Sequence, residues 1–119
     1  MAMNPIFNRQ GVVVAWMNGL NIHGLNGSHL AVLNRESVYG HAGQHLGRLT
    51  NGLFRDHRGA VVAFVRGGSG GPVLPVTQVA PVPPVPAVSP VPAVPAVPPV
   101  PPVPALSWSF MDWRKFISQ

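Results

Sequence analysis

The chain has 119 residues, enough for one modest domain with appended segments. It contains no cysteine, which excludes disulfide bonds and thiolate metal sites. Eight Lys and Arg residues against three Asp and Glu give a formal net charge of +5, which disfavours cationic partners and weakly favours anionic ones.

The N-terminal decapeptide MAMNPIFNRQ lacks a basic stretch followed by an apolar run, so no signal peptide is expected. No charged residue lies between Arg66 and Asp112, but the prolines of that stretch remove backbone donors and clash with a helical turn. A membrane-spanning helix is therefore not expected there. These features predict a cytoplasmic or membrane-peripheral protein.

One motif recurs four times at a spacing of sixteen residues. Each copy has a glycine, an apolar residue three positions later, a small residue next, and a second apolar residue two positions after that. A further apolar residue lies five positions before each glycine. In this order the columns are Gly11, Gly27, Gly43 and Gly59; Val14, Leu30, Leu46 and Val62; Ala15, Ala31, Gly47 and Ala63; Met17, Leu33, Leu49 and Val65; and Ile6, Ile22, Val38 and Phe54.

Each sixteen-residue unit predicts a β-hairpin of two short strands. The run Val12–Met17 is rich in β-branched and apolar residues, as are its counterparts. Asn18-Gly19 is a strong hairpin signal, and a shorter strand centred on Ile22 follows it. Glycines such as Gly59 supply the positive φ of the second turn. The chain is therefore expected to be all-β.

Sixteen residues cannot bury an apolar face alone, so the four units must pack on one another. Closure into a shallow four-fold-symmetric barrel removes exposed strand edges and places the small column nearest the axis. An open twisted sheet is the alternative. Strict alternation puts the Val14 and Met17 columns on opposite faces, so the second apolar face would need cover from the tail, another copy, a lipid surface or a partner.

Several motifs, in their order along the chain, resemble one known family. They are Asn8-Arg9-Gln10-Gly11, Ala15-Trp16, the segment 62–67, a Gly-rich joint, a Pro-rich linker and Leu106-Ser107-Trp108-Ser109. The chain resembles the 4-fold beta flower proteins, which are small and mostly bacterial. The resemblance implies a shallow symmetric β-barrel with petal-like hairpins and no settled biochemical activity. The uncharged linker and Arg48, where other units carry Trp16, Val32 and Phe64, depart from the family pattern.

Composition divides the chain into three segments. We expect a four-repeat domain at residues 1–68, a Gly-rich and then Val/Pro/Ala-rich linker at 69–105, and an aromatic C-terminal tail at 106–119. The linker favours polyproline II and, as a free spacer, would reach on the order of 90 Å. Its P-x-x-P spacings have no flanking Arg or Lys, so recognition by SH3-type domains is not expected.

The tail predicts a short helix with an apolar side. Ser109 is the expected N-cap, with Asp112 at the third position, and Trp113, Phe116 and Ile117 share one side. So short a helix needs a surface in order to form. We expect it to dock on its own barrel, on a second copy, on a partner or on a bilayer.

No catalytic set is expected. The only acidic residues of the repeats, Glu36 and Asp56, lie in different columns, and no nucleophile elbow is present. The Gly-rich run 67–71 lacks the lysine and the helix of a phosphate loop. We therefore expect neither enzyme activity nor a cofactor.

The histidines offer an incomplete metal site. His29 and His45 share one column, and His41 and His57 share another, so each column pair is expected on neighbouring petals. Imidazole pairs bind zinc or copper, but a catalytic zinc normally has three protein ligands. No metal is therefore predicted, and a small-ligand or metal-binding module using the paired histidines or the apolar centre is the alternative function.

The leading hypothesis is a non-enzymatic binding module in which a spacer joins the flower to the aromatic tail, for protein assembly or peripheral membrane association. The expected partners are a protein or an anionic membrane surface, with self-association through the tail as a further option. Nucleic acid is not expected, because few aromatic residues are free to stack bases. The candidate binding residues are the turn arginines and the tail aromatics: Arg9, Arg35, Arg55, Arg58, Arg66, Trp108, Trp113 and Phe116.

Overall fold

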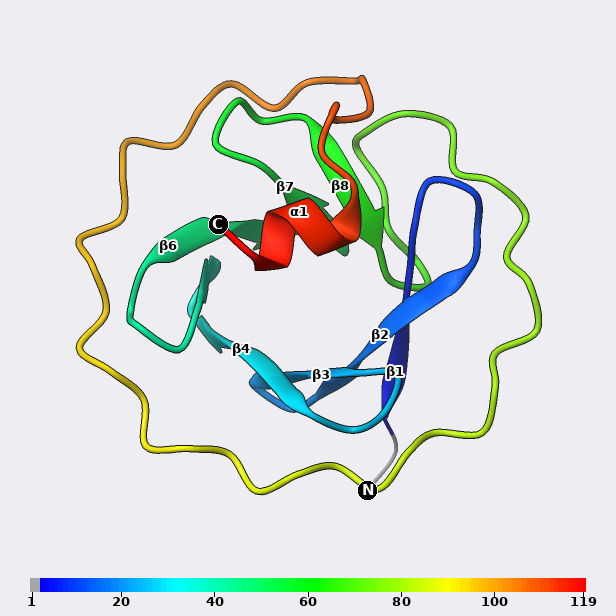
Figure 1. Cartoon of the computed structure of the whole chain (residues 1–119). Helices are drawn as coiled ribbons and strands as arrows, with labels where there is room; N and C mark the ends of the chain where they lie inside the picture. Colours follow the sequence, from blue (N-terminus) through cyan, green and yellow to red (C-terminus); the bar gives the residue numbers. More distant parts are fainter. Residues whose placement is uncertain (1–2) are drawn as a thin grey trace.

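The computed structural model describes residues 3–119, in which eight antiparallel strands close into a barrel (Figure 1). Each strand pairs with its neighbour in sequence, and β8 closes the barrel against β1. The predicted all-β barrel is confirmed, and the open sheet is not formed. The strands are β1 (Asn4–Phe7), β2 (Val13–Asn18), β3 (Asn21–Gly24), β4 (His29–Asn34), β5 (Ser37–Tyr39), β6 (His45–Thr50), β7 (Leu53–Arg55) and β8 (Val61–Phe64).

A β-bulge recurs at one column of the sequence repeat. Ile6 pairs with Ala15, but the next residue, Phe7, pairs with Val13, so Val14 has no partner. The same register shift leaves Leu30, Leu46 and Val62, the other residues of the Val14 column, without a strand partner. An extra residue changes the alternation of side chains, so the Val14 column packs in the same interior cluster as the Met17 column. The prediction that these columns lie on opposite faces is wrong.

The barrel interior is filled by side chains from the strands and from the tail. The Ile6 column is completely buried and lies opposite the small column in the strand pairing. At the third small position, Gly47, an added Cβ would lie 2.6 Å from Phe116 Cε1. The carbonyl oxygen of Arg55 is nearer still, so the strand backbone and the Phe116 ring together leave no room for an alanine side chain.

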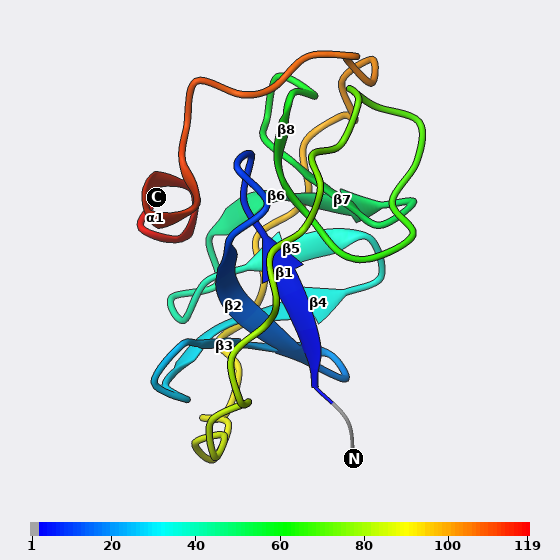
Figure 2. The same ribbon diagram turned by 90° about the vertical axis from the view of Figure 1, so that its right-hand side faces the viewer.

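Helix α1 (Trp113–Ile117) lies across one end of the barrel (Figure 2). The turns at that end, residues 8–11, 24–27, 40–43 and 56–59, are called the petal turns below, and this end is the petal end. Trp113 and Phe116 are buried, and the Trp113 ring lies 5.3 Å from the ring of Phe54 between centroids. The tail therefore docks on its own barrel. Among residues 3–119, no helix is long and apolar enough to cross a membrane.

The N-cap of α1 differs from the prediction. Asp112 caps the helix by accepting a hydrogen bond from the backbone N–H of Lys115 at 2.8 Å. Ser109 lies outside the helix, where its hydroxyl donates to Asp56 and accepts from the backbone N–H of Met111 at 3.0 Å. The serine was wrongly expected to cap because its role in binding the barrel is not visible in local spacing.

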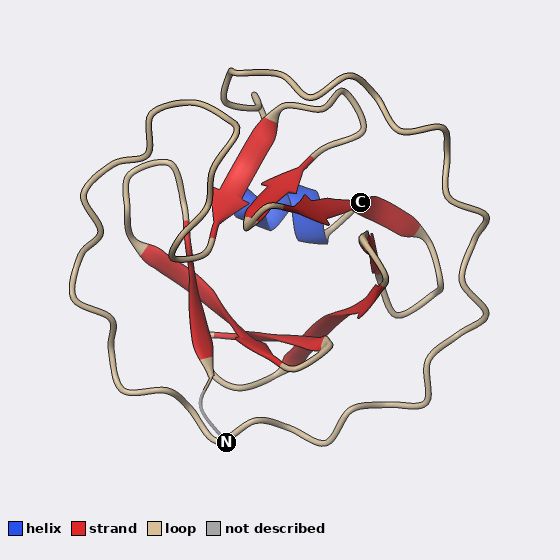
Figure 3. Cartoon of the chain, turned by 180° about the vertical axis from the view of Figure 1, so that it is seen from behind, coloured by secondary structure: helices blue, strands red, loops and turns tan. Residues whose placement is uncertain are grey.

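Residues 72–105, called the belt, encircle the barrel (Figures 1 and 3). Each quarter of the belt donates one backbone N–H to the carbonyl of a petal glycine, with N···O distances between 2.8 and 3.1 Å. The donor and acceptor pairs are Gln78 and Gly11, Ala87 and Gly27, Ala96 and Gly43, and Ala105 and Gly59. The Pro-rich segment is extended as expected, but it wraps the barrel and does not act as a free spacer.

The dimensions of belt and barrel match. The four contacts are nine residues apart along the belt, and nine residues of polyproline II span about 28 Å. The molecule is 36 Å across, so a quarter of its circumference is also about 28 Å. The petal glycines have φ between 80° and 88°, and a Cβ on any of them would meet a belt carbonyl oxygen. The belt therefore advances by nine residues for each sixteen-residue unit of the barrel.

Candidate interaction surfaces

Arg55 is buried and joins the segment just before the belt to the end of the belt. Its guanidinium donates to the carbonyl oxygens of Gly59 at 2.6 Å, Ala105 at 2.7 Å and Gly70 at 2.9 Å. Burial lowers the pKa of Arg55 from its ordinary value, yet an arginine stays protonated at any physiological pH. Arg55 is thus part of the fold and does not belong to an exposed basic surface.

The start of the tail is bound to the same petal. The Val61 N–H donates to the Ser107 carbonyl at 3.0 Å, and the Ser109 N–H donates to the Val61 carbonyl at 2.7 Å. Between them, the Trp108 ring lies 6.2 Å from the ring of Phe64. Asp56 accepts from Ser109 and from the backbone N–H groups of its own turn. The tail is therefore held by both backbone and side chains.

The other predicted arginines are divided between the two ends of the barrel. Arg9 and Arg58 lie in petal turns, whereas Arg35 and Arg66 lie in turns at the opposite end. The guanidinium carbon of Arg66 also lies 5.7 Å from the centroid of the Phe7 ring. The structure does not bring the five candidate arginines together into one basic collar.

The tail aromatics are mostly occupied within the molecule. Trp113 and Phe116 are buried in the barrel interior, and Trp108 packs on the outside of β8. A partner therefore has no access to Phe116. Phe110, which no pattern in the sequence marks as a candidate, is fully exposed at 101% of its reference area.

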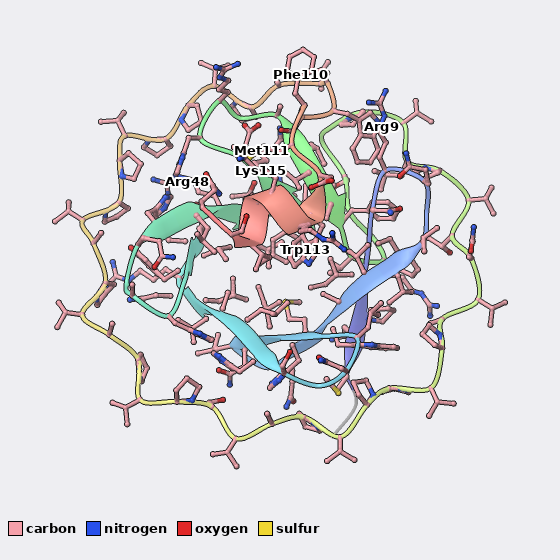
Figure 4. The ribbon with its side chains drawn as sticks, viewed as in Figure 1. Arg9, Arg48, Phe110, Met111, Trp113 and Lys115 are labelled. Atoms are coloured by element: carbon pink, nitrogen blue, oxygen red, sulfur yellow. The ribbon has the colours of Figure 1, made fainter. Side chains whose placement is uncertain are left out.

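An open groove of about 510 Å³ lies at the petal end and is called the petal-end groove. Apolar side chains from the tail line one wall, and the first two petal turns form the other. Arg9 and Arg114 line it as well, and Figure 4 shows Phe110, Trp113 and Arg9 on this face. Its apolar lining residues are Val14, Leu25, Val61, Val62, Trp108, Phe110, Met111 and Trp113.

The outer edge of the belt forms the second exposed surface. Every third residue from Val73 to Val103 is valine, and polyproline II has three residues per turn. All eleven side chains therefore lie on the same, outer side of the belt and are 86–96% exposed. Figure 4 shows side chains along the belt pointing away from the barrel. This valine rim comprises Val73, Val76, Val79, Val82, Val85, Val88, Val91, Val94, Val97, Val100 and Val103.

Four histidines form two hydrogen-bonded pairs, each of which joins one histidine from each of the two columns. His29 Nδ1 lies 2.8 Å from His41 Nε2, and the equivalent atoms of His45 and His57 are 3.0 Å apart. His29 Nε2 lies 2.9 Å from the side-chain oxygen of Asn21. Because that oxygen can only accept, His29 Nε2 carries a proton and Nδ1 accepts from His41.

The environment of these pairs disfavours added charge. Desolvation, followed by the charges of His41 and His23, lowers the pKa of His29. Desolvation, followed by the charges of His57 and Arg48, lowers the pKa of His45. No group of three or more His, Cys, Asp or Glu side chains within residues 3–119 is arranged to hold a metal ion.

The comparisons with known proteins identify the family. The family model described as 4-fold beta flower protein matches residues 4–117. No curated protein and no solved structure matches the chain. The family match takes in the barrel, the belt and helix α1. By this match, the chain belongs to the 4-fold beta flower family.

Proposed function

We propose that this protein is a non-enzymatic binding module that assembles with another protein through the valine rim. The observation that supports this proposal is the exposure of eleven valines in one continuous stripe around the barrel. Contiguous apolar patches larger than a few hundred Å² mark interaction surfaces on soluble proteins. The structural role of the belt does not explain why its solvent-facing position is always valine.

The backbone of the belt favours a protein partner over the interior of a membrane. Prolines supply no N–H, and each quarter of the belt makes one hydrogen bond to a petal glycine. Many belt carbonyls therefore depend on water, and their transfer into hydrocarbon without a donor is unfavourable. A protein surface can offer donors beside an apolar contact, so it suits the rim better.

An anionic membrane surface finds less support than a protein partner. The turn arginines are divided between the two ends, and the rim between them is uncharged. Trp113, which would be the interfacial anchor, is buried in the barrel. Each individual arginine near anionic lipid would contribute only about 1 kcal/mol.

No observation favours the alternative of a small-ligand or metal site at the apolar centre or at the paired histidines. Phe54, Trp113 and Phe116 fill the apolar centre. The Nδ1 atoms of His29 and His45 are engaged by His41 and His57, and their Nε2 atoms by Asn21 and Ser37. The buried charged side chains Arg55 and Asp56 hold the belt and the tail through their hydrogen bonds.

The test compares two variants that carry the same added charge. The rim variant changes Val73, Val82, Val91 and Val100 to lysine, and these side chains are at least 90% exposed. The control variant changes Asn34, Glu36 and Ala42, which are also exposed, to lysine. Both variants gain four units of positive charge and retain the backbone of the belt.

Immobilised wild-type protein and control variant should retain the same protein partner from native lysate, and the rim variant should lose it. Sedimentation with neutral and acidic vesicles forms the second arm. If only vesicle binding distinguishes the rim variant from the control, the rim contacts lipid and the proposal of a protein partner is wrong.

A further inference from the structure

We infer that the petal-end groove is a binding site for polyproline II segments and that its occupant is the valine rim of a second copy of this chain. This inference builds on the proposed function, because it names the partner of the rim. It would make the protein self-assembling, with one groove and four similar belt quarters in each copy.

The groove has the chemistry that recognises polyproline II. Domains that bind Pro-rich segments do so with grooves lined by aromatic side chains. Here Trp108, Phe110 and Trp113 line an open groove of about 510 Å³, within the range of ordinary ligand sites. Phe110 is completely exposed, so the folded molecule gives this phenyl ring no packing role.

The same molecule already binds a polyproline II segment by these means. Trp16 belongs to an outer apolar cluster on which Leu74 and Ala80 of the belt pack. Arg48 donates to the carbonyl of Pro99 at 2.6 Å, and Arg55 donates to that of Ala105. Aromatic faces and arginine donors to belt carbonyls are therefore the recognition chemistry of this fold.

The petal-end groove repeats this combination without a bound segment. Its aromatic wall comes from the tail, and Arg9 and Arg114 line it as potential donors to carbonyl oxygens. The belt of the same molecule is hydrogen-bonded to all four petal glycines, which fixes it on the circumference. A segment that enters the groove must therefore come from another molecule.

Charge and exposure favour the rim of a second copy as that segment. The chain carries a net charge of +5, so most contacts between copies would bring like charges together. The belt contains no charged residue, and its approach to Arg9 and Arg114 avoids that repulsion. The valines that would enter the groove are nearly fully exposed in all four quarters.

The contact joins two different surfaces, so it is heterologous. Contacts of this kind extend into chains or close into rings, depending on the rotation between successive copies. The expected species in solution are therefore a series of oligomers whose population rises with concentration.

The direct test is a titration of the full-length protein with a synthetic peptide of residues 81–98, PVPPVPAVSPVPAVPAVP. Isothermal calorimetry should detect binding, and Phe110→Ala should weaken it at least tenfold. Leu20→Ala is the matched control, since Leu20 is 66% exposed and lies outside the groove. This control should bind the peptide like the wild type.

Absence of peptide binding at millimolar concentration overturns the inference. Equal binding by Phe110→Ala and wild type also overturns it, because the peptide would then occupy another surface. A peptide with lysine at each of its valines should not bind.

Sedimentation velocity separates this inference from the proposed function. Wild type should form oligomers that both Phe110→Ala and the rim variant abolish, whereas Leu20→Ala and the charge-matched control retain them. If the rim variant forms no oligomers but Phe110→Ala still does, the rim is a protein-binding surface and the groove is not its partner. If wild type stays monomeric at all concentrations, self-assembly is refuted, and the lysate experiment alone decides on the rim.

Discussion

At the scale of single residues, Arg55 joins parts of the chain that are far apart in sequence. Its guanidinium holds the carbonyl of Gly70 just before the belt, that of Ala105 at the end of the belt and that of Gly59 in the fourth petal turn. The corresponding positions in the other repeats are Phe7, His23 and Tyr39, which cannot make these three contacts. The arginine is needed only in the quarter where the belt begins and ends.

Arg55→Met should destabilise the fold by about 3 kcal/mol, because one buried and two partly buried hydrogen bonds from a charged donor are lost. Urea unfolding followed by circular dichroism measures this difference. Arg58→Met is the control, since Arg58 is an exposed arginine of the adjacent petal turn and should change stability by less than about 0.5 kcal/mol. Equal effects of the two substitutions would show that Arg55 does not fasten the belt.

The histidine pairs should make stability depend on pH. Folding lowers the pKa of His29 and of His45, so the unfolded chain binds more protons as pH falls below about 6.5. The stability present above that pH is lost progressively below it. The urea midpoint of the wild type should therefore be lower at pH 5 than at pH 7.5.

The double variant His29→Gln and His45→Gln tests the source of this pH dependence. It removes the hydrogen-bonded imidazole from each pair and leaves His41 and His57 exposed. The difference between the urea midpoints at the two pH values should shrink. A difference of the wild-type size would assign the effect to other groups.

At the scale of elements, the belt is held by a register of one hydrogen bond every nine residues. Ala96 supplies the N–H for Gly43 at 2.8 Å. Its counterparts, Gln78, Ala87 and Ala105, are also not proline. Proline would fit the polyproline II backbone at these positions but would remove the donor.

Ala96→Pro should destabilise the protein by about 1–2 kcal/mol, because the Gly43 carbonyl loses its donor. Ser89→Pro is the control: Ser89 is an exposed belt residue outside the nine-residue series of donors, and proline there should be neutral or slightly stabilising. Thermal unfolding of the two variants measures the contrast. The proposed register is wrong if both prolines have the same effect.

The strands and turns were predictable from sequence because their signals are local and recur at sixteen residues. The bulge was not, since an apolar residue such as Val14 suits either face and nothing in its type marks the extra position. The nine-residue period of the belt could not be recognised because a three-residue period of valines is superimposed on it. Valine at every third residue dominates the segment, and the missing prolines at Ala87, Ala96 and Ala105 were the only trace of the longer register.

At the scale of the whole molecule, barrel, belt and tail form one structure. The tail helix supplies Trp113 and Phe116 to the interior cluster, and the belt covers an outer cluster that includes Trp16. The sequence predicted that the tail needs a surface but not which one, because apolar character alone does not identify a partner. Gly47 is the one departure from alanine in its column, and only the structure shows that a Cβ at this position would meet the Arg55 carbonyl and the Phe116 ring.

Two phenylalanines of the tail provide a matched test of this arrangement. Phe116 is completely buried in the barrel, whereas Phe110 is completely exposed six residues earlier. Phe116→Ala should destabilise the whole barrel by about 3–5 kcal/mol, because it leaves a cavity between α1 and the strands. Phe110→Ala should leave the stability within about 0.5 kcal/mol of the wild type.

Urea unfolding measured by far-UV circular dichroism and by tryptophan fluorescence should give coincident transitions for both variants. Coincidence is expected because Trp16, Trp108 and Trp113 report on the outer cluster, the start of the tail and the interior of one cooperative unit. A barrel transition unchanged by Phe116→Ala would mean that the tail is dispensable for the fold. In that case the tail would be independent of the barrel, and the petal-end groove, one wall of which is the tail, could not be a stable site.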